Sequence, residues 1–157
     1  MIKIAVGGTF EYLHDGHKKL IKKAFSIANK GIVHIGLTSN KMAKLKMRRV
    51  VDYSIRKTNL LKYIESLSIK GIQYSIIELN DAYGTTLTMD YDYIIVSPET
   101  YSFSLKINEL RNNLGKKEIK ILKIESVMAE DGIPISSTRI SNREIDIHGK
   151  LINKSKS

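Results

Sequence analysis

The sequence predicts a single doubly wound α/β domain, in which a five-stranded parallel sheet is covered by helices on both faces. Segments with strand character alternate with segments of helical periodicity along the chain. The strand segments are continuous apolar runs, which is typical of strands buried on both faces. Gly31, Gly71 and Gly115 fall just past the expected helix ends, where a left-handed residue stops a helix. With 157 residues, the chain has room for one core and little room for a second domain.

The expected elements follow one another as strand and helix. Five apolar runs are expected to form the strands, at residues 2–6, 32–37, 73–78, 93–97 and 119–124. Helical patterns cover residues 15–29, 51–67, 101–114 and 137–147, with a shorter helix around 40–46. The first helix carries apolar residues at core spacing, namely Leu20, Ile21, Ala24, Phe25 and Ala28. The long middle helix does the same, at Ile55, Leu60, Leu61, Ile64 and Leu67.

The charge of the chain raises the question of nucleic-acid binding, because its formal net charge is +10. Two basic clusters stand out, which are Lys18, Lys19, Lys22 and Lys23, and then Lys41, Lys44, Lys46, Arg48 and Arg49. Neither cluster is interleaved with the aromatic residues on which single-stranded nucleic acids stack. We interpret most of these side chains as solvated helix faces that also attract phosphorylated substrates. We therefore expect no nucleic-acid partner, and keep such binding as a minor alternative.

The chain contains no cysteine, which excludes disulfides, thiol catalysis and thiolate metal sites. No apolar stretch approaches the length of a membrane span, and the first residues have the character of a strand rather than of a signal peptide. These features predict a cytoplasmic protein with no membrane partner.

The segment from Gly7 to His17 carries the strongest functional signal. Two glycines follow the first strand, and the next helix begins at two histidines separated by Gly16. Free N–H groups at such a turn bind anions, so the segment indicates phosphate chemistry. One alternative is a turn without function, and another is a metal site at His14 and His17. The metal site is disfavoured because zinc normally needs three or four protein ligands, and the other two histidines lie far away in sequence.

A second polar segment lies near the C-terminus, at Ser136, Ser137, Thr138 and Arg139. Hydroxyl side chains are natural helix caps, so one interpretation is an ordinary capped helix. Hydroxyls, helix-start amides and an arginine can also form an oxyanion site. The sequence alone leaves both interpretations open.

Together, the two segments resemble the nucleotidylyltransferase superfamily. Residues 8–17 match its Gly-Thr-Phe-x-x-x-His-x-Gly-His signature, and residues 135–140 are similar to its Ile-Ser-Ser-Thr motif. Further segments resemble the archaeal and eukaryotic type of phosphopantetheine adenylyltransferase, at residues 36–46, 96–100, 107–111 and 129–132. The resemblance implies a Rossmann-like nucleotidylyltransferase domain at residues 1–149, followed by a polar C-terminal tail at 150–157.

The resemblance implies that the partners are ATP and 4′-phosphopantetheine, and the products dephospho-coenzyme A and pyrophosphate. The attacking phosphate is already an anion and needs no general base, so catalysis consists of positioning and charge stabilisation. Mg²⁺ would arrive with ATP, and no metal site of the protein's own is expected. We expect a monomer or a small homo-oligomer.

The family motifs also imply roles for individual residues. Thr9 would hold the attacking phosphate, His17 the α-phosphate, and Lys44 would bridge the phosphates of both substrates, which makes these three the catalytic candidates. His14 would bind the leaving pyrophosphate, and the serines with Thr138 the β- and γ-phosphates. The candidate substrate-binding residues are Gly8, Thr9, Phe10, His14, Gly16, His17, Lys44, Ser136, Ser137, Thr138 and Arg139.

Several positions stay ambiguous. Lys44 is favoured over Lys46 as the bridging lysine because a loop lysine readily binds phosphate. Tyr83 with Gly84, and Glu99 with Thr100, either line a substrate pocket or belong to ordinary loops. Arg111 is expected to reach phosphate or solvent, while His34 and His148 are expected outside the site. The family usually has an arginine where this chain has Ser141, and Arg139 or Arg143 is the expected replacement.

Three of these segments, at residues 9–17, 38–46 and 97–100, follow the carboxyl ends of expected strands, and residues 136–138 open the last helix. We therefore expect these four to lie at one edge of the sheet, where open parallel sheets bind ligands. Two other enzyme classes are alternatives, of which the first shares the Gly-Thr-Phe and His-x-Gly-His signature. A cytidylyltransferase acting on a small phosphorylated alcohol typically has Arg-Thr-Glu-Gly before its second motif, whereas residues 129–134 read Ala-Glu-Asp-Gly-Ile-Pro. A nicotinamide-nucleotide adenylyltransferase usually has Arg-Phe-x-Pro where residues 9–12 read Thr-Phe-Glu-Tyr. A noncatalytic nucleotide- or RNA-binding module is the alternative of a different class.

Overall fold

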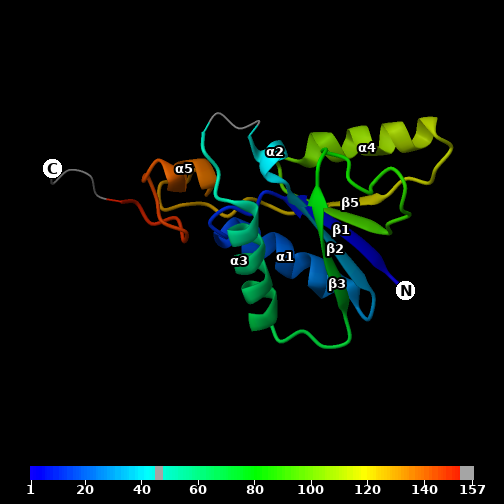
Figure 1. Ribbon diagram of the computed structural model, residues 1–157, viewed down its shortest axis with the longest axis horizontal. Coiled ribbons are helices and arrows are strands. Elements are labelled where there is room, and N and C mark those ends of the chain that lie inside the picture. Colours follow the sequence, from blue (N-terminus) through cyan, green and yellow to red (C-terminus); the bar gives the residue numbers. More distant parts are fainter. Residues whose placement is uncertain (45–47, 153–157) are drawn as a thin grey trace.

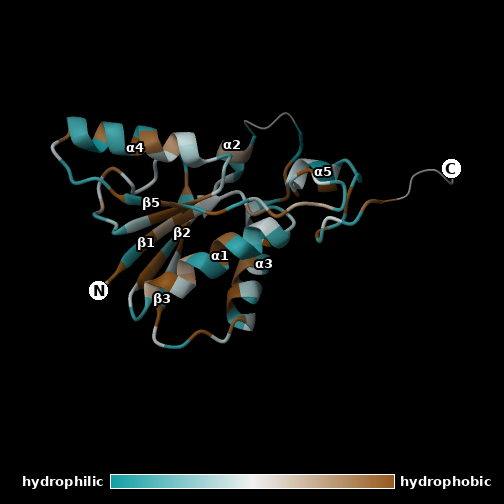
Figure 2. Cartoon of the chain, turned by 180° about the vertical axis from the view of Figure 1, so that it is seen from behind, coloured by the Kyte–Doolittle hydropathy of each residue, from teal (hydrophilic) through white to brown (hydrophobic). Residues whose placement is uncertain are grey.

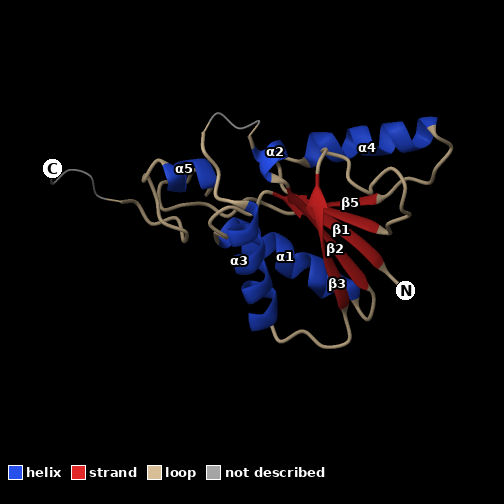
Figure 3. Cartoon of the chain, in the orientation of Figure 1, coloured by secondary structure: helices blue, strands red, loops and turns tan. Residues whose placement is uncertain are grey.

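The computed structural model describes residues 1–44 and 48–152, and a five-stranded parallel sheet lies at its centre (Figure 1, Figure 3). The strands are β1 (Lys3–Gly8), β2 (Ile32–Thr38), β3 (Gln73–Leu79), β4 (Tyr93–Val96) and β5 (Lys120–Lys123). They pair in the order β3-β2-β1-β4-β5, and every pair is parallel. From β1, the chain first adds β2 and β3 on one side, and it then adds β4 and β5 on the other side. The strand order therefore reverses between β1 and β4, where doubly wound sheets bind ligands.

Helices cover both faces of this sheet, as the sequence predicts (Figure 1). They are α1 (Asp15–Ala28), α2 (Asn40–Ala43), α3 (Tyr53–Ser66), α4 (Tyr101–Asn113) and α5 (Ser137–Ser141). Helices α1 and α3 lie on one face and α4 on the other, while α2 follows the carboxyl end of β2. Within the two described stretches, no helix is both long enough and apolar enough to span a bilayer.

Alternate residues of each strand feed two separate cores, one on each face. Ile4 and Val6 of β1 pack with Ile21 of α1 and Leu60 of α3, whereas Ala5 packs on the opposite face with α4. This alternation is the geometry of an extended strand, in which successive side chains point to opposite faces. Figure 2 shows the resulting pattern, with apolar residues on the strands and hydrophilic residues interspersed along the helices.

The predicted strands and the first four helices are confirmed, with small differences at their ends, and residues 45 and 46 of the predicted short helix lie outside the described residues. Strand β1 continues through Gly7 and Gly8, because both pair with β2. Helix α3 begins at Tyr53 instead of residue 51, since the carboxylate of Asp52 accepts a hydrogen bond from the Ser54 N–H and caps the helix.

The last helix is much shorter than predicted, because α5 ends at Ser141 instead of residue 147. Arg143 adopts a left-handed φ of 59°, and the Glu144 N–H donates to the Arg139 carbonyl, which closes the helix end. The chain then turns back, and Ile145 pairs with Leu151 in an antiparallel bridge. The first part of the expected polar tail is therefore held by backbone hydrogen bonds, whereas residues 153–157 lie outside the described residues.

Candidate active site

The loop between β1 and α1 holds an unusual backbone. Phe10, Tyr12 and Leu13 all have left-handed φ values, of 49°, 63° and 40°. Such conformations each cost free energy in a residue with a side chain, so the surrounding packing must hold them. Phe10 and Leu13 supply that packing, because both side chains are buried in the core beneath α1. The signature loop is therefore a rigid turn at the sheet's switch point.

The two histidines of this loop are held by the start of α1. The His14 Nδ1 accepts hydrogen bonds from the Gly16 N–H at 3.0 Å and the His17 N–H at 3.3 Å. The His17 Nδ1 in turn accepts from the His14 N–H at 3.3 Å, and the two rings stack with centroids 3.6 Å apart. Because each Nδ1 is an acceptor, each ring in its neutral form carries its proton on Nε2. Nε2–H is thus the ring donor of each neutral histidine.

Burial lowers the pKa of His14 from 6.5 to about 4, although the nearby Asp15 carboxylate opposes the shift. The imidazole therefore stays neutral near neutral pH. Gly16 is needed for this arrangement, since a Cβ there would meet the His14 ring at 2.9 Å. The glycine thus makes room for the histidine ring itself.

The second motif reaches the signature loop across 126 residues. The Ser137 hydroxyl donates to the Glu11 carbonyl at 2.8 Å. Ser136 caps α5, since its hydroxyl accepts from the Arg139 N–H at 3.2 Å. The two segments that the sequence singled out therefore meet, and the capped-helix interpretation also holds for Ser136.

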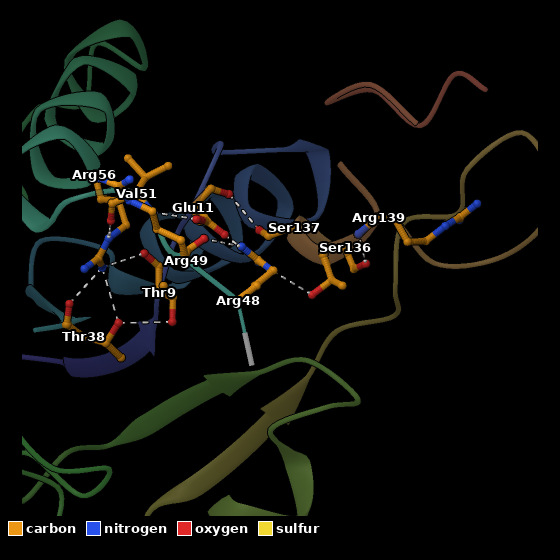
Figure 4. Close-up of polar contacts among 11 residues, drawn as sticks. Thr9, Glu11, Thr38, Arg48, Arg49, Val51, Arg56, Ser136, Ser137 and Arg139 are labelled. Carbon is orange, nitrogen blue, oxygen red and sulfur yellow. Dashed lines mark hydrogen bonds and ion pairs between the residues drawn. The ribbon is translucent and has the colours of Figure 1, made fainter. Parts of the chain in front are cut away.

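A network of buried charged side chains braces this junction (Figure 4). Glu11 is 1% exposed, and its carboxylate accepts from the Val51 N–H at 2.7 Å and pairs with Arg48 at 2.6 Å. Arg56 is equally buried, and it donates to the carbonyls of Val51, Thr9 and Thr38. The Thr38 hydroxyl donates to the Thr9 hydroxyl at 3.1 Å. The carboxyl ends of β1 and β2 are thus tied to the segment before α3.

Two cavities meet at the end of β1. The first, which we call the apolar pocket, has a volume of about 350 Å³ and lies on the α4 face among walls that include Ile77, Leu79, Tyr83, Ile94 and Phe103. The second, which we call the rim pocket, has a volume of about 240 Å³ and is lined by His14, His17, Ser136 and Ser137. Both cavities are lined by Gly7, Gly8, Thr9, Glu99 and Thr100. The site therefore offers two binding regions that share one edge.

His34 lines the apolar pocket, so the expectation that this histidine lies outside the site is corrected. Its Nδ1 lies 2.8 Å from the Tyr91 hydroxyl, which lies 2.6 Å from the Thr85 hydroxyl. Burial lowers the pKa of His34, which favours the neutral ring. These three side chains form a connected polar group in the wall of a mainly apolar pocket.

Known proteins match this chain over nearly its full length. A family profile described as cytidylyltransferase-like matches residues 5–143. The phosphopantetheine adenylyltransferases of Methanosarcina mazei and Methanosarcina barkeri are 56% and 58% identical over 151 residues, which span 96% of this chain and 97% and 93% of theirs. The chain belongs to the phosphopantetheine adenylyltransferase family. A crystal structure from Archaeoglobus fulgidus, titled as a protein with unknown function, has a TM-score of 0.72 at 40% identity and covers 86% of this chain and 100% of its own.

An enzyme of this family binds phosphorylated substrates, so the positions of the cationic side chains near the site matter. Arg139 is engaged elsewhere, because it pairs with Asp131 and donates to the Ile133 carbonyl at 3.3 Å. The hydrogen bond from Arg139 holds the pKa of Asp131 below its usual range. Figure 4 shows the Arg139 side chain directed away from Glu11 and Arg48. Arg139 therefore anchors the preceding loop, and we no longer count it among the phosphate contacts.

The other cationic side chains that the sequence singled out lie in different surroundings. Lys44 is exposed at the end of α2, and Lys46 lies outside the described residues. Arg143 is exposed beyond α5. Arg111 is buried and donates to the carbonyls of Lys117, Thr86 and Met89, so the expectation that it reaches phosphate or solvent is wrong.

The sequence motifs did not mark three charged residues that brace the site, which are Glu11, Arg48 and Arg56. Arg56 carried a signal, because it shares the buried stripe of α3 with Leu60 and Ile64 at helical spacing. A charged residue on such a stripe indicates a buried, paired side chain. The pairing of Glu11 with Arg48 joins residues 37 positions apart in irregular segments, and no periodicity marks it.

Proposed function

We propose that this nucleotidyltransferase moves the adenylyl group of ATP to 4′-phosphopantetheine, giving dephospho-coenzyme A and pyrophosphate. The observation that carries the proposal is the pair of cavities of unlike character that share Gly7, Gly8 and Thr9. One substrate is a long, largely uncharged arm with a phosphate at one end, and the other is a nucleotide with three phosphates. A shared edge between the two pockets allows the two phosphates to meet.

The apolar pocket suits the pantetheine arm. Its walls are apolar side chains from the sheet and from α4, and its one end is formed by Gly8 and Thr9. The Thr9 hydroxyl and N–H would hold the phosphate of the arm at that end. The polar group of His34, Tyr91 and Thr85 would face an amide of the arm, since an apolar pocket orients its ligand by a few polar contacts.

The rim pocket suits the phosphates of ATP. The Nε2–H groups of His14 and His17 would donate to phosphate oxygens, with His17 on the α-phosphate and His14 on the leaving side. The hydroxyls of Ser136 and Ser137 would contact the β- and γ-phosphates, and Thr138 lies beside them. Gly8 and Gly16 keep the backbone open there, and Phe10 contacts the His17 ring at a centroid distance of 5.3 Å.

The reaction would then proceed by in-line displacement. An oxygen of the acceptor phosphate forms a bond to the α-phosphorus, and the bond from that phosphorus to the β-phosphate oxygen breaks. Pyrophosphate leaves with the electron pair of that bond. Charge that develops on the phosphates is stabilised by the histidine donors and by a lysine, for which we retain Lys44 as the candidate.

Mg²⁺ is expected to bind with ATP and to neutralise part of the phosphate charge. The described residues contain no group of three or more His, Cys, Asp or Glu placed to hold a metal ion. The imidazole and hydroxyl groups of the rim pocket suit phosphates that bring their own Mg²⁺, which keeps most of its water ligands. Because ATP and 4′-phosphopantetheine are cytoplasmic metabolites, we place the reaction in the cytoplasm, with a monomer or a small homo-oligomer as its unit.

The test is pyrophosphate release by the purified protein with Mg²⁺, 4′-phosphopantetheine and either ATP or CTP. We expect release with ATP, little release with CTP, and loss of release in the His17→Ala variant. Preference for CTP, or silence with 4′-phosphopantetheine and activity with another phosphorylated alcohol, would refute the assignment.

A further inference from the structure

A buried carboxylate belongs to the loop that forms part of the rim pocket. Glu11 belongs to the signature loop and is 1% exposed, and its backbone carbonyl accepts a hydrogen bond from the hydroxyl of Ser137, which lines the rim pocket. A buried carboxylate near a bound triphosphate repels it unless a cation lies between them. Arg48 supplies that cation, with Nη2 at 2.6 Å from the carboxylate.

The three nitrogens of the Arg48 guanidinium make different contacts, which Figure 4 shows as dashed lines. Nη2 makes the short, charged contact to Glu11. Nε donates to the Thr138 hydroxyl at 3.3 Å, and Nη1 donates to the Arg49 carbonyl at 3.4 Å. The last two contacts are long and involve neutral acceptors. A phosphate oxygen is a stronger acceptor than either, because a charge-assisted hydrogen bond is shorter and stronger than one to a neutral acceptor.

Two other arginines near the site are already engaged in contacts within the protein. Arg139 is held by Asp131 and by loop carbonyls, and Arg56 is buried with its donors on carbonyls. Arg143 lies beyond the end of α5 and is exposed. Arg48 is 17% exposed and contacts Thr138, whose neighbour Ser137 lines the rim pocket. It therefore combines access to solvent with a fixed position beside the hydroxyl motif.

We propose that Arg48 binds the terminal phosphates of ATP and that Glu11 is the residue that positions it. The proposal rests on the proposed function and deepens it, because it names the cation that stands in for the arginine absent at Ser141. In the bound state, Nη2 stays on Glu11, while Nε and Nη1 leave Thr138 and the Arg49 carbonyl for phosphate oxygens. The Glu11 carboxylate is then screened from the nucleotide by the same guanidinium.

Equilibrium titration with ATP, AMP and pyrophosphate tests the proposal, in the presence of Mg²⁺ and without the acceptor. Arg48→Ala is expected to weaken the binding of ATP and of pyrophosphate by about 10- to 100-fold, which corresponds to the loss of charge-assisted hydrogen bonds. Binding of AMP, which lacks the terminal phosphates, is expected to change less than about twofold. Arg48→Lys keeps the charge but lacks the fixed donors at Nε and Nη1, and its ATP affinity is expected to fall between these values.

Arg49→Ala is the matched control, because it removes the same charge from an exposed neighbour and retains the backbone carbonyl. It is expected to weaken ATP binding by less than about threefold, and mainly at low salt. Glu11→Gln tests the positioning role. It is expected to weaken ATP binding by about three- to tenfold and to leave AMP binding unchanged, since the terminal phosphates alone depend on Arg48.

Two results would overturn the proposal. In the first, Arg48→Ala weakens ATP and AMP equally, with Arg48→Lys doing the same, which would show that the side chain only holds the loop. In the second, both Arg48 variants bind ATP as the natural chain does. Failure of the proposed function differs from both, because a natural chain that binds ATP but transfers nothing to 4′-phosphopantetheine would leave the ATP and AMP titrations intact.

Discussion

The apolar pocket and the rim pocket share the end of β1 and differ in nearly everything else. The apolar pocket lies over one face of the sheet. Its walls include side chains of the strands and of α4 that also belong to the core on that face. The rim pocket lies at the carboxyl ends of the strands and is built from loops and the starts of α1 and α5. We expect the apolar pocket to select its ligand by shape, and the rim pocket to select by charge and hydrogen bonding. Substitutions should therefore separate the two substrates cleanly.

The largest effect is expected from His17→Ala, which removes the proposed donor to the α-phosphate. We expect kcat to fall by about 10²- to 10³-fold, the usual cost of a donor that stabilises a transition state. Pyrophosphate release under saturating substrates measures the effect. Because the ring also accepts the His14 N–H, circular dichroism and thermal unfolding must show a folded variant. A folded variant with kcat within threefold of normal would remove His17 from the chemistry.

The stability of the fold should depend on pH through His14 of the rim pocket. The His14 pKa is about 4 in the fold and 6.5 as the ordinary value. Below pH 6.5 the unfolded chain takes up a proton that the folded chain does not, so the fold loses stability until the pH reaches about 4. The loss is expected to be up to about 3 kcal/mol.

His14→Asn tests this assignment, since asparagine is a good N-cap that does not titrate in this range. Urea unfolding of both proteins at pH 7, 5.5 and 4.5 is the measurement. The variant should lose less stability on acidification than the natural chain. Parallel curves for the two proteins would mean that another group causes the acid loss.

A methyl group added at Gly7 or at Gly8 should separate the two substrates. A Cβ at Gly7 would lie 3.8 Å from Leu79 and 3.5 Å from the Gly36 carbonyl, which belong to the apolar pocket. A Cβ at Gly8 would lie 3.4 Å from the Phe10 ring, on the side of the rim pocket. We expect Gly7→Ala to raise KM for 4′-phosphopantetheine by about tenfold, and Gly8→Ala to raise KM for ATP by about the same.

Steady-state kinetics with each substrate varied in turn checks this pair, and each variant is the control of the other. Neither glycine has a left-handed φ, so both variants should fold. An equal rise of both KM values in both variants would show that the pockets are one binding region and not two.

The smallest effect is expected from Tyr91→Phe, which removes the hydroxyl that joins His34 and Thr85. We expect KM for 4′-phosphopantetheine to rise by about threefold, the usual worth of one neutral hydrogen bond, while KM for ATP stays the same. Kinetics with the acceptor varied measures it. A change in KM for ATP instead would place this polar group outside the arm's path.

Much of the fold was predictable, because apolar runs and helical spacing are local signals. The end of α5 was not, since Arg143 takes a left-handed conformation that favours glycine or asparagine. The chain stops the helix there because Ile145 is fully buried and pairs with Leu151, a contact that no local pattern encodes. Tertiary packing overrides helix propensity at this point.

The site divides in the same way. Motif residues such as His14, His17 and Ser137 could be predicted because their spacing is fixed by one loop or one helix start. His34 could have been placed by strand geometry, since it alternates with Val33 and Ile35, which pack in the opposite core. Arg48 could not, because a basic cluster in sequence looks the same whether its members are solvated or paired with a buried Glu11.

The contact between Ser137 and Glu11 spans 126 residues, and that between His148 and Asp15 spans 133. Sheet and apolar pocket are complete once β5 has formed, whereas the rim pocket needs the last segments of the chain. During synthesis, which runs from the N-terminus at about 5–20 residues per second, the apolar pocket can therefore form before the rim pocket. A nascent chain whose residues 136–148 are still inside the ribosome already has the two histidines, but it cannot complete the rim pocket.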